Sequence, residues 1–81
     1  MDDRAVVVLR IHERGFEADL DIPLDISANE LLLGLNEAYQ LSIDMSNTAN
    51  CYLRTENPIA LLRGSKTLYE YGVHNGTIIN I

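Results

Sequence analysis

The segment from Phe16 to Ile22 constrains the fold most, because apolar and acidic residues alternate along it without a fault. Successive side chains of a strand point to opposite faces, so this pattern predicts a β-strand with one buried face. The apolar face consists of Phe16, Ala18, Leu20 and Ile22. The other face carries Glu17, Asp19 and Asp21, and carboxylates spread along a flat strand do not converge on one ion. We therefore expect a solvated acidic row there, not a cation site.

A second strand is predicted at Ala5–Ile11, which is β-branched and aliphatic. Between the two strands, His12-Glu13-Arg14-Gly15 ends in the residue that most easily takes a positive φ. The two strands and this turn predict a β-hairpin.

A helix is predicted to begin at Ala28, after Pro23 and Asp25 break the strand, because Ser27 and Glu30 have the spacing of a capping box. Apolar residues then recur at spacings of three and four, which indicates an amphipathic helix packed on a sheet. They are Leu31, Leu32, Leu35, Ala38 and Tyr39, with Leu33 off the stripe. Gly34 costs about 1 kcal/mol relative to alanine, so we expect close packing around it.

The rest of the chain predicts shorter elements joined by turns. In chain order these are an irregular connection (Leu41–Asn50), a strand (Cys51–Thr55) closed by Glu56–Pro58, a short strand (Ile59–Leu62), a polar turn (Arg63–Lys66), one helical turn (Thr67–Val73), a tight turn (His74–Gly76) and a last strand (Thr77–Ile81). Thr67 would cap the helical turn, and Gly72 in a left-handed conformation would end it. This order predicts a mixed sheet that grasps one helix, an α+β fold of the β-grasp class, in a single domain over residues 1–81.

The composition of the chain excludes several classes of partner and location. Twelve acidic residues against six basic ones give a net charge of -6, which disfavours nucleic acid and anionic lipid as partners. Acids at Asp2 and Asp3 replace the basic segment of a signal peptide, and the apolar run from Ala5 stops at Arg10, too soon for a membrane span. We expect a cytoplasmic protein without membrane insertion.

No constellation for catalysis is visible in the sequence. His12 and His74 fall in predicted turns without a paired nucleophile or the spacing of a metal site. Cys51 is the single cysteine, and its apolar surroundings in the sequence favour a buried thiol. We therefore expect no enzymatic activity, cofactor or metal.

Four apolar side chains are predicted on the sheet face opposite the helix. If Val7, Leu9, Ile11, Leu53, Ile79 and Ile81 face inward, the alternation turns outward Val6, Val8, Tyr52 and Ile78. The first and last strands of a β-grasp are central neighbours, so the four could form a patch between the acidic row and Arg54. Two interpretations stay open: a protein-binding surface, or valines that are ordinary strand formers.

The C-terminal segment carries a specific resemblance. Thr67 to Val73 and Asn75 to Ile81 resemble the Leu-x-x-Tyr-Gly-Ile/Val-x-x-Gly-x-x-Ile/Leu pattern of ubiquitin-like proteins, with Leu68, Tyr71 and Val73 matching. In length, acidic character and the Asn-Gly before the last strand, the chain is similar to the YukD/EsaB-type proteins of type VII (WXG100) secretion systems. The resemblance implies a non-enzymatic accessory or regulator that binds secretion components.

Three functional hypotheses follow. Ubiquitin and the sulfur carriers activate a C-terminal diglycine, whereas Ile79-Asn80-Ile81 stands here, so we expect no conjugation. A secretion-associated adaptor and a homo-oligomeric ubiquitin-like scaffold, for example a homodimer, stay open, because an apolar sheet face serves either role.

Overall fold

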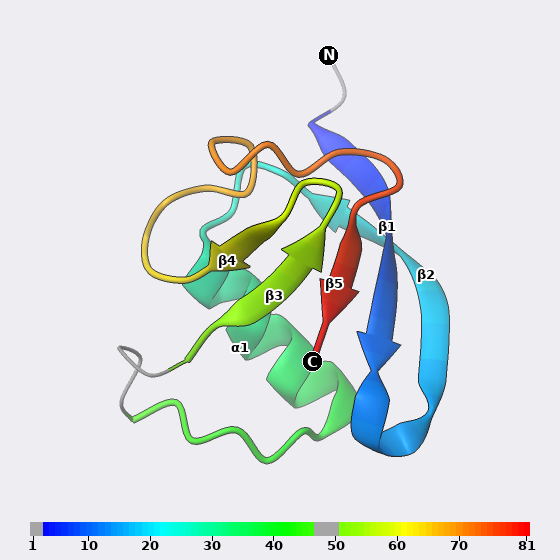
Figure 1. Ribbon diagram of the computed structural model, residues 1–81. Helices are drawn as coiled ribbons and strands as arrows, with labels where there is room; N and C mark the ends of the chain where they lie inside the picture. The colour runs from blue at the N-terminus through cyan, green and yellow to red at the C-terminus, as the bar shows by residue number, and fades with distance from the viewer. Residues whose placement is uncertain (1–2, 47–50) are drawn as a thin grey trace.

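In the computed structural model, which describes residues 3–46 and 51–81, five strands form one mixed sheet with a single helix on one face (Figure 1). The strands follow the spatial order β2-β1-β5-β3-β4. The elements are β1 (Arg4–Ile11), β2 (Phe16–Pro23), α1 (Ala28–Tyr39), β3 (Leu53–Glu56), β4 (Ala60–Leu62) and β5 (Ile78–Asn80). Each predicted strand is present, with its ends displaced by one or two residues.

The predicted hairpin joins β1 to β2. The two strands pair antiparallel along their whole length, and a short 3₁₀ helix, His12–Arg14, occupies the turn. Gly15 follows with φ of 60°, the left-handed conformation that the sequence predicts. The strand ends at Pro23, as predicted, and Pro23 itself still pairs with Arg4. An edge strand tolerates proline, since its outward side needs no N–H donor.

The first and last strands are central neighbours, as predicted. β1 and β5 run parallel, and the N–H of Val8 donates to the carbonyl of Thr77 at 2.9 Å. Beyond β5, the N–H of Ile81 donates to the carbonyl of Arg10 at 2.9 Å. Parallel neighbours need a crossover connection, and α1 belongs to that connection.

Helix α1 begins with the predicted capping box. Ser27 Oγ accepts from the N–H of Glu30 at 3.1 Å, and the Glu30 carboxylate accepts from the N–H of Ser27 at 3.2 Å. The buried face consists of Ala28, Leu31, Leu32 and Leu35. Ala38 is exposed, contrary to prediction, because the row continues from Leu35 to the half-buried Tyr39 four residues on.

Close packing at Gly34 is also not observed. A Cβ placed there would meet no atom within 4 Å outside its own helix backbone and chain neighbours. Leu33 beside it is 45% exposed, which agrees with its predicted place off the stripe. The glycine therefore weakens the helix without a packing contact that offsets the cost.

The core lies between α1 and the inner face of the sheet. Of the side chains predicted to face inward, Val7, Leu9, Ile11, Leu53 and Ile79 are buried, while Ile81 is half-buried. Cys51 is buried as predicted, and its thiol contacts the carbonyl oxygen of Asp44 at 3.2 Å. A single core thus uses residues from every strand and from the helix.

β2 contributes less to this core than predicted. Ile22 is buried, but Ala18 and Leu20 are only half-buried and Phe16 is 38% exposed. The ring of Phe16 rests against that of Tyr39, with centroids 5.6 Å apart. The alternation is correct, but β2 is an edge strand and the layer that covers its inner face is incomplete.

The connection after α1 is irregular, as predicted, over residues 41–46, and its predicted part at 47–50 lies outside the described residues. The Asn36 side chain forms two hydrogen bonds with the backbone of Ile43, at 2.9 and 3.1 Å. The hydroxyl and the N–H of Ser46 donate to the Asp44 carboxylate and lower the pKa of Asp44. These side-chain contacts replace the missing regular structure.

The predicted helical turn at residues 67–73 is a single turn, in which the N–H of Tyr71 donates to the carbonyl of Thr67 at 3.2 Å, and no regular helix extends from it. The predicted end groups are nevertheless in place: Thr67 Oγ1 accepts from the N–H of Glu70 at 3.2 Å, and Gly72 has φ of 83°. The N–H of Val73 donates to the carbonyl of Leu68, five residues back. This bond closes the segment and buries both side chains in the core.

Candidate functional site

The outer face of the sheet, opposite α1, holds the residues singled out from the sequence. The register places Val8 beside Ile78, and Arg54 between Asn80 and Leu61. Val6 is 49% exposed and Tyr52 is 44% exposed, while Val8 and Ile78 are half-buried. The predicted orientation of all four apolar side chains is therefore observed.

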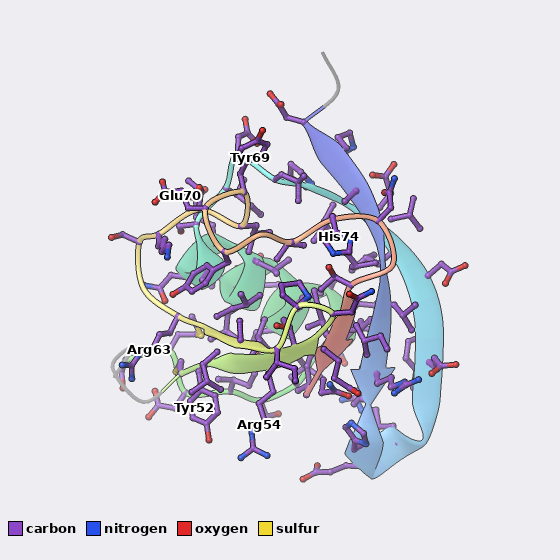
Figure 2. All side chains as sticks on the ribbon, turned by 45° about the horizontal axis from the view of Figure 1, so that its top comes forward. Tyr52, Arg54, Arg63, Tyr69, Glu70 and His74 are labelled. Carbon is purple, nitrogen blue, oxygen red and sulfur yellow. The ribbon has the colours of Figure 1, made fainter. Side chains whose placement is uncertain are left out.

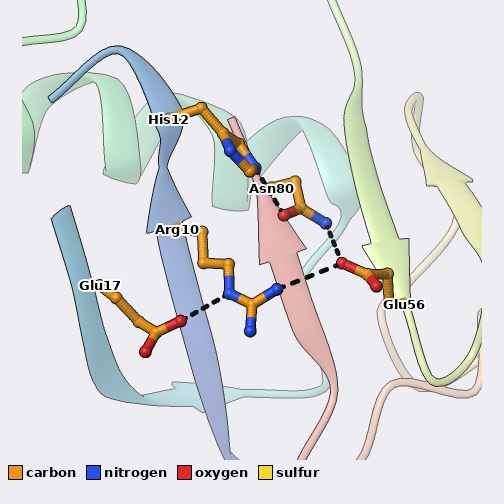
Figure 3. Close-up of polar contacts among 5 residues, drawn as sticks. All are labelled: Arg10, His12, Glu17, Glu56 and Asn80. Atoms are coloured by element: carbon orange, nitrogen blue, oxygen red, sulfur yellow. Dashed lines mark hydrogen bonds and ion pairs between the residues drawn. The ribbon is translucent and has the colours of Figure 1, made fainter. Parts of the chain in front are cut away.

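A polar network crosses the middle of this face (Figure 3). Arg10 Nε donates to Glu17 Oε1 at 2.6 Å, and Arg10 Nη1 lies 3.6 Å from Glu56 Oε2. The Asn80 amide donates to the same Glu56 oxygen at 3.0 Å and contacts His12 Nε2 through its own oxygen at 2.8 Å. Side chains from β2, β1, β5 and β3 are thereby linked.

The charge of Arg10 is held by this network. Its hydrogen bond to Glu17 has the largest effect and raises the pKa of the guanidinium above the usual value. Loss of hydration opposes this shift, and the charges of Glu17 and Glu56 add to it.

The network separates the predicted residues into two groups. Val6, Val8 and Ile78 lie together on one side of the row formed by Arg10 and Asn80. The register of β3 places Tyr52 on the other side of that row. The four side chains therefore do not form one continuous apolar surface.

A shallow groove of about 810 Å³ lies on the β3–β4 half of the outer face. Its apolar lining includes Tyr52, Leu61, which is 51% exposed, and Ile59, which is 92% exposed. Sequence reasoning missed Leu61 and Ile59. The signal was present, because Leu61 and Leu62 are adjacent on a strand and cannot both face the core.

Arg54 differs from the arginines of β1 in having no carboxylate partner within the described part of the chain. Its guanidinium lies 5.9 Å from the centroid of the Tyr52 ring, at the mouth of the groove. Figure 2 shows Tyr52, Arg54 and Arg63 together at one end of the molecule. The groove therefore combines exposed apolar side chains with an unpaired positive charge.

Neither histidine belongs to a metal cluster. Over residues 3–46 and 51–81, no group of three or more His, Cys, Asp or Glu side chains converges as metal ligands would. His12 instead joins the polar network through Asn80, and His74 Nδ1 contacts the carbonyl oxygen of Asn75 at 2.7 Å. No helix in the described ranges has the length and apolarity to span a membrane.

The sheet order and the single helix define a ubiquitin-like β-grasp domain, the predicted α+β fold, and solved structures agree. The ubiquitin-like domain of tubulin-binding cofactor B is 18% identical with a TM-score of 0.74, covering 99% of this chain and 89% of its own. A designed protein based on ubiquitin is 22% identical with a TM-score of 0.67, covering 96% and 85%. The corresponding domain of Plasmodium falciparum Dsk2 is 20% identical with a TM-score of 0.61, covering 95% and 96%. At these identities the likeness shows the fold alone.

Family assignment comes from a family model. Residues 6–81 match the family described as WXG100 protein secretion system (Wss), protein YukD. The chain therefore belongs to the YukD family, as its length, its acidic character and the Asn75-Gly76 before the last strand predict. No curated protein matches the chain significantly.

Proposed function

We propose that this protein is a non-enzymatic, cytoplasmic accessory or regulatory subunit of a type VII (WXG100) secretion system, folded as one ubiquitin-like domain. Membership of the YukD family supports the link to secretion. The protein acts by binding other proteins and not by conjugation.

The groove between β3 and β4 is the observation that carries the proposal. Ile59, Leu61 and Tyr52 expose apolar surface together, and burial of such surface is the main favourable term in protein association. Arg54 adds an arginine next to an aromatic ring, the residue types that most often dominate binding energy. We therefore place the principal contact with the partner here.

Val6, Val8 and Ile78 form the second part of the proposed protein-binding surface. They lie beyond the polar network and are less exposed as a group than the groove residues. A partner that covers both parts also covers Arg10 and Glu56. Burying a paired, hydrogen-bonded charge contributes to specificity more than to affinity.

The test is secretion of a WXG100 substrate by a strain that lacks the gene. Wild-type protein is expected to restore the substrate to the medium, and a Leu61→Glu variant is not. Leu33→Glu is the matched control, because Leu33 is similarly exposed (45%) but lies on α1, away from the outer face. Unchanged secretion in the deletion strain would contradict the proposed role, and equal failure of both variants would contradict the proposed surface.

A homo-oligomeric scaffold unrelated to secretion is the second candidate, because the groove is equally suited to a second copy of the chain. Light scattering on the purified protein at several concentrations distinguishes the two. A monomer whose mass does not change with Leu61→Glu excludes the scaffold. A dimer that this substitution dissociates supports it.

A further inference from the structure

The free edge of β2 lies at the opposite end of the sheet from the groove (Figure 1). Within residues 3–46 and 51–81, β2 pairs only with β1 and runs from Phe16 to Pro23, so one of its sides has no paired strand over eight residues. An unpaired edge of this length is a template for another strand.

The hydrogen-bond pattern shows which backbone groups of β2 are free. The N–H of Leu24 donates to the carbonyl of Asp3 at 2.6 Å, and bonded pairs alternate along an antiparallel ladder. By the register, the bonded pairs then include Ile22 with Ala5 and Leu20 with Val7. The N–H and C=O groups directed away from β1 belong to Glu17, Asp19 and Asp21.

The other side of β1 gives the same assignment independently. The N–H of Val8 donates to Thr77, and the carbonyl of Val6 accepts from Gly76. Even-numbered residues of β1 therefore bond towards β5, which leaves the odd-numbered ones to bond β2. The carbonyl of Asp21 accordingly points away from β1, where it accepts a hydrogen bond from Arg4 Nη2 at 3.4 Å that an added strand would replace.

The side chains along this edge are acidic on the outer face and apolar on the inner face. On the outer face, Asp19 has no ionic partner among the described residues, while Glu17 and Asp21 each give one oxygen to an arginine of β1. On the inner face, Phe16, Ala18 and Leu20 remain partly exposed, so the apolar layer is unfinished. An added strand would meet acidic groups on one face and apolar groups on the other.

We infer that the β2 edge binds an extended protein segment in which basic and apolar residues alternate. The segment's main chain bonds to Glu17, Asp19 and Asp21, its Lys or Arg side chains face their carboxylates, and its apolar side chains cover Phe16, Ala18 and Leu20. Main-chain bonds supply affinity in this binding mode and the alternate side chains supply specificity. This site is separate from the groove and does not depend on the proposed role in secretion.

A second copy of the chain does not fit this edge. Antiparallel pairing of two β2 strands about Asp19 places Asp19 opposite its copy and Glu17 opposite Asp21. Like charges directly opposite one another destabilise a strand pair. The acidic row therefore disfavours self-association and selects a cationic partner.

The test uses purified protein and a capped six-residue peptide of alternating lysine and valine, followed by amide NMR. Added peptide is expected to slow hydrogen exchange about tenfold at the amides of Glu17, Asp19 and Asp21. The amides of Ala18, Leu20 and Ile22 are bonded to β1 already and should change much less. Uniform protection along β2, or perturbation confined to the β3–β4 groove, would overturn the proposal.

Exchanging charges between the protein and the peptide tests whether the peptide binds specifically at the β2 edge or is attracted only by the net negative charge of the protein. Asp19→Lys is expected to weaken binding about fivefold, and a peptide with glutamate replacing its central lysine should recover the loss. Glu70→Lys makes the same change in net charge on the side of the molecule away from β2 (Figure 2) and should leave binding nearly unchanged. Equal weakening by both variants, or failure of the exchanged peptide, would show attraction by net charge alone.

Discussion

The two halves of the outer face use their charges differently. On the β1–β2 half, both Arg4 and Arg10 are held by acids of β2, at 3.0 and 2.6 Å. On the β3–β4 half, Arg54 forms no ion pair within the described chain and lies against the Tyr52 ring beside exposed leucine and isoleucine. The first half pairs both of its arginines, whereas the second leaves an unpaired arginine and apolar surface for a partner.

The largest expected effect is on stability, and it distinguishes a buried residue of β4 from the exposed residue beside it. Leu62 is 1% exposed and Leu61 is 51% exposed, although they are adjacent in β4. Leu62→Ala should lower the free energy of unfolding by about 2–5 kcal/mol, because it leaves a cavity in the core. Leu61→Ala should change it by no more than about 0.5 kcal/mol.

Urea denaturation with a constant slope measures both values. A loss of several kcal/mol from Leu61→Ala would mean that the β3–β4 half belongs to the folded core. Its exposed side chains would then not be evidence of a binding surface.

The next prediction compares the two halves directly as binding surfaces. Val6 on β1 and Leu61 on β4 have nearly equal exposure, 49% and 51%, and lie on different halves of the outer face. Leu61→Ser should weaken binding of the secretion partner about tenfold, as expected for an anchor in a groove, and Val6→Ser by less than about threefold. Isothermal titration against the purified partner measures the ratio. The reverse order would move the main contact to the group of Val6, Val8 and Ile78.

Much of the fold could be predicted from local patterns. The alternation after Gly15, the Ser27–Glu30 capping box and the left-handed Gly72 each specify a local geometry that the structure contains. Errors occurred where burial depends on which element covers a side chain. Phe16 has the correct face but lies on an edge strand, and Ala38 lies outside the row that packs on the sheet.

The candidate site was less predictable than the fold. Period-two alternation correctly turns Val6, Val8, Tyr52 and Ile78 outward, but it carries no information on which strands lie between them. The network of Arg10, Glu56 and Asn80 joins residues up to 70 positions apart in the register of three strands. Only the strand order shows that this network divides the apolar side chains.

A third prediction tests whether a change in stability alone alters affinity for the partner. Gly34→Ala should raise the free energy of unfolding by about 1 kcal/mol, because alanine is a better helix former and the added methyl group meets no atom within 4 Å. Since α1 lies opposite the outer face, affinity for the partner should not change. Denaturation and titration on the same variant check both statements, and altered affinity would show that stability contributes to the differences between the two halves.

The smallest expected effect concerns the arginines themselves. Arg10→Gln removes contacts with Glu17 and Glu56, and should lower the free energy of unfolding only slightly, since exposed ion pairs contribute little. The loss should shrink in 1 M NaCl, where screening weakens the pairs in the wild type. The same change at Arg54 removes no ion pair, so its effect should be smaller and independent of salt. If Arg54→Gln destabilised the protein as much as Arg10→Gln and with the same dependence on salt, Arg54 would be paired in solution. The contrast between the two halves would then rest on the apolar groove alone.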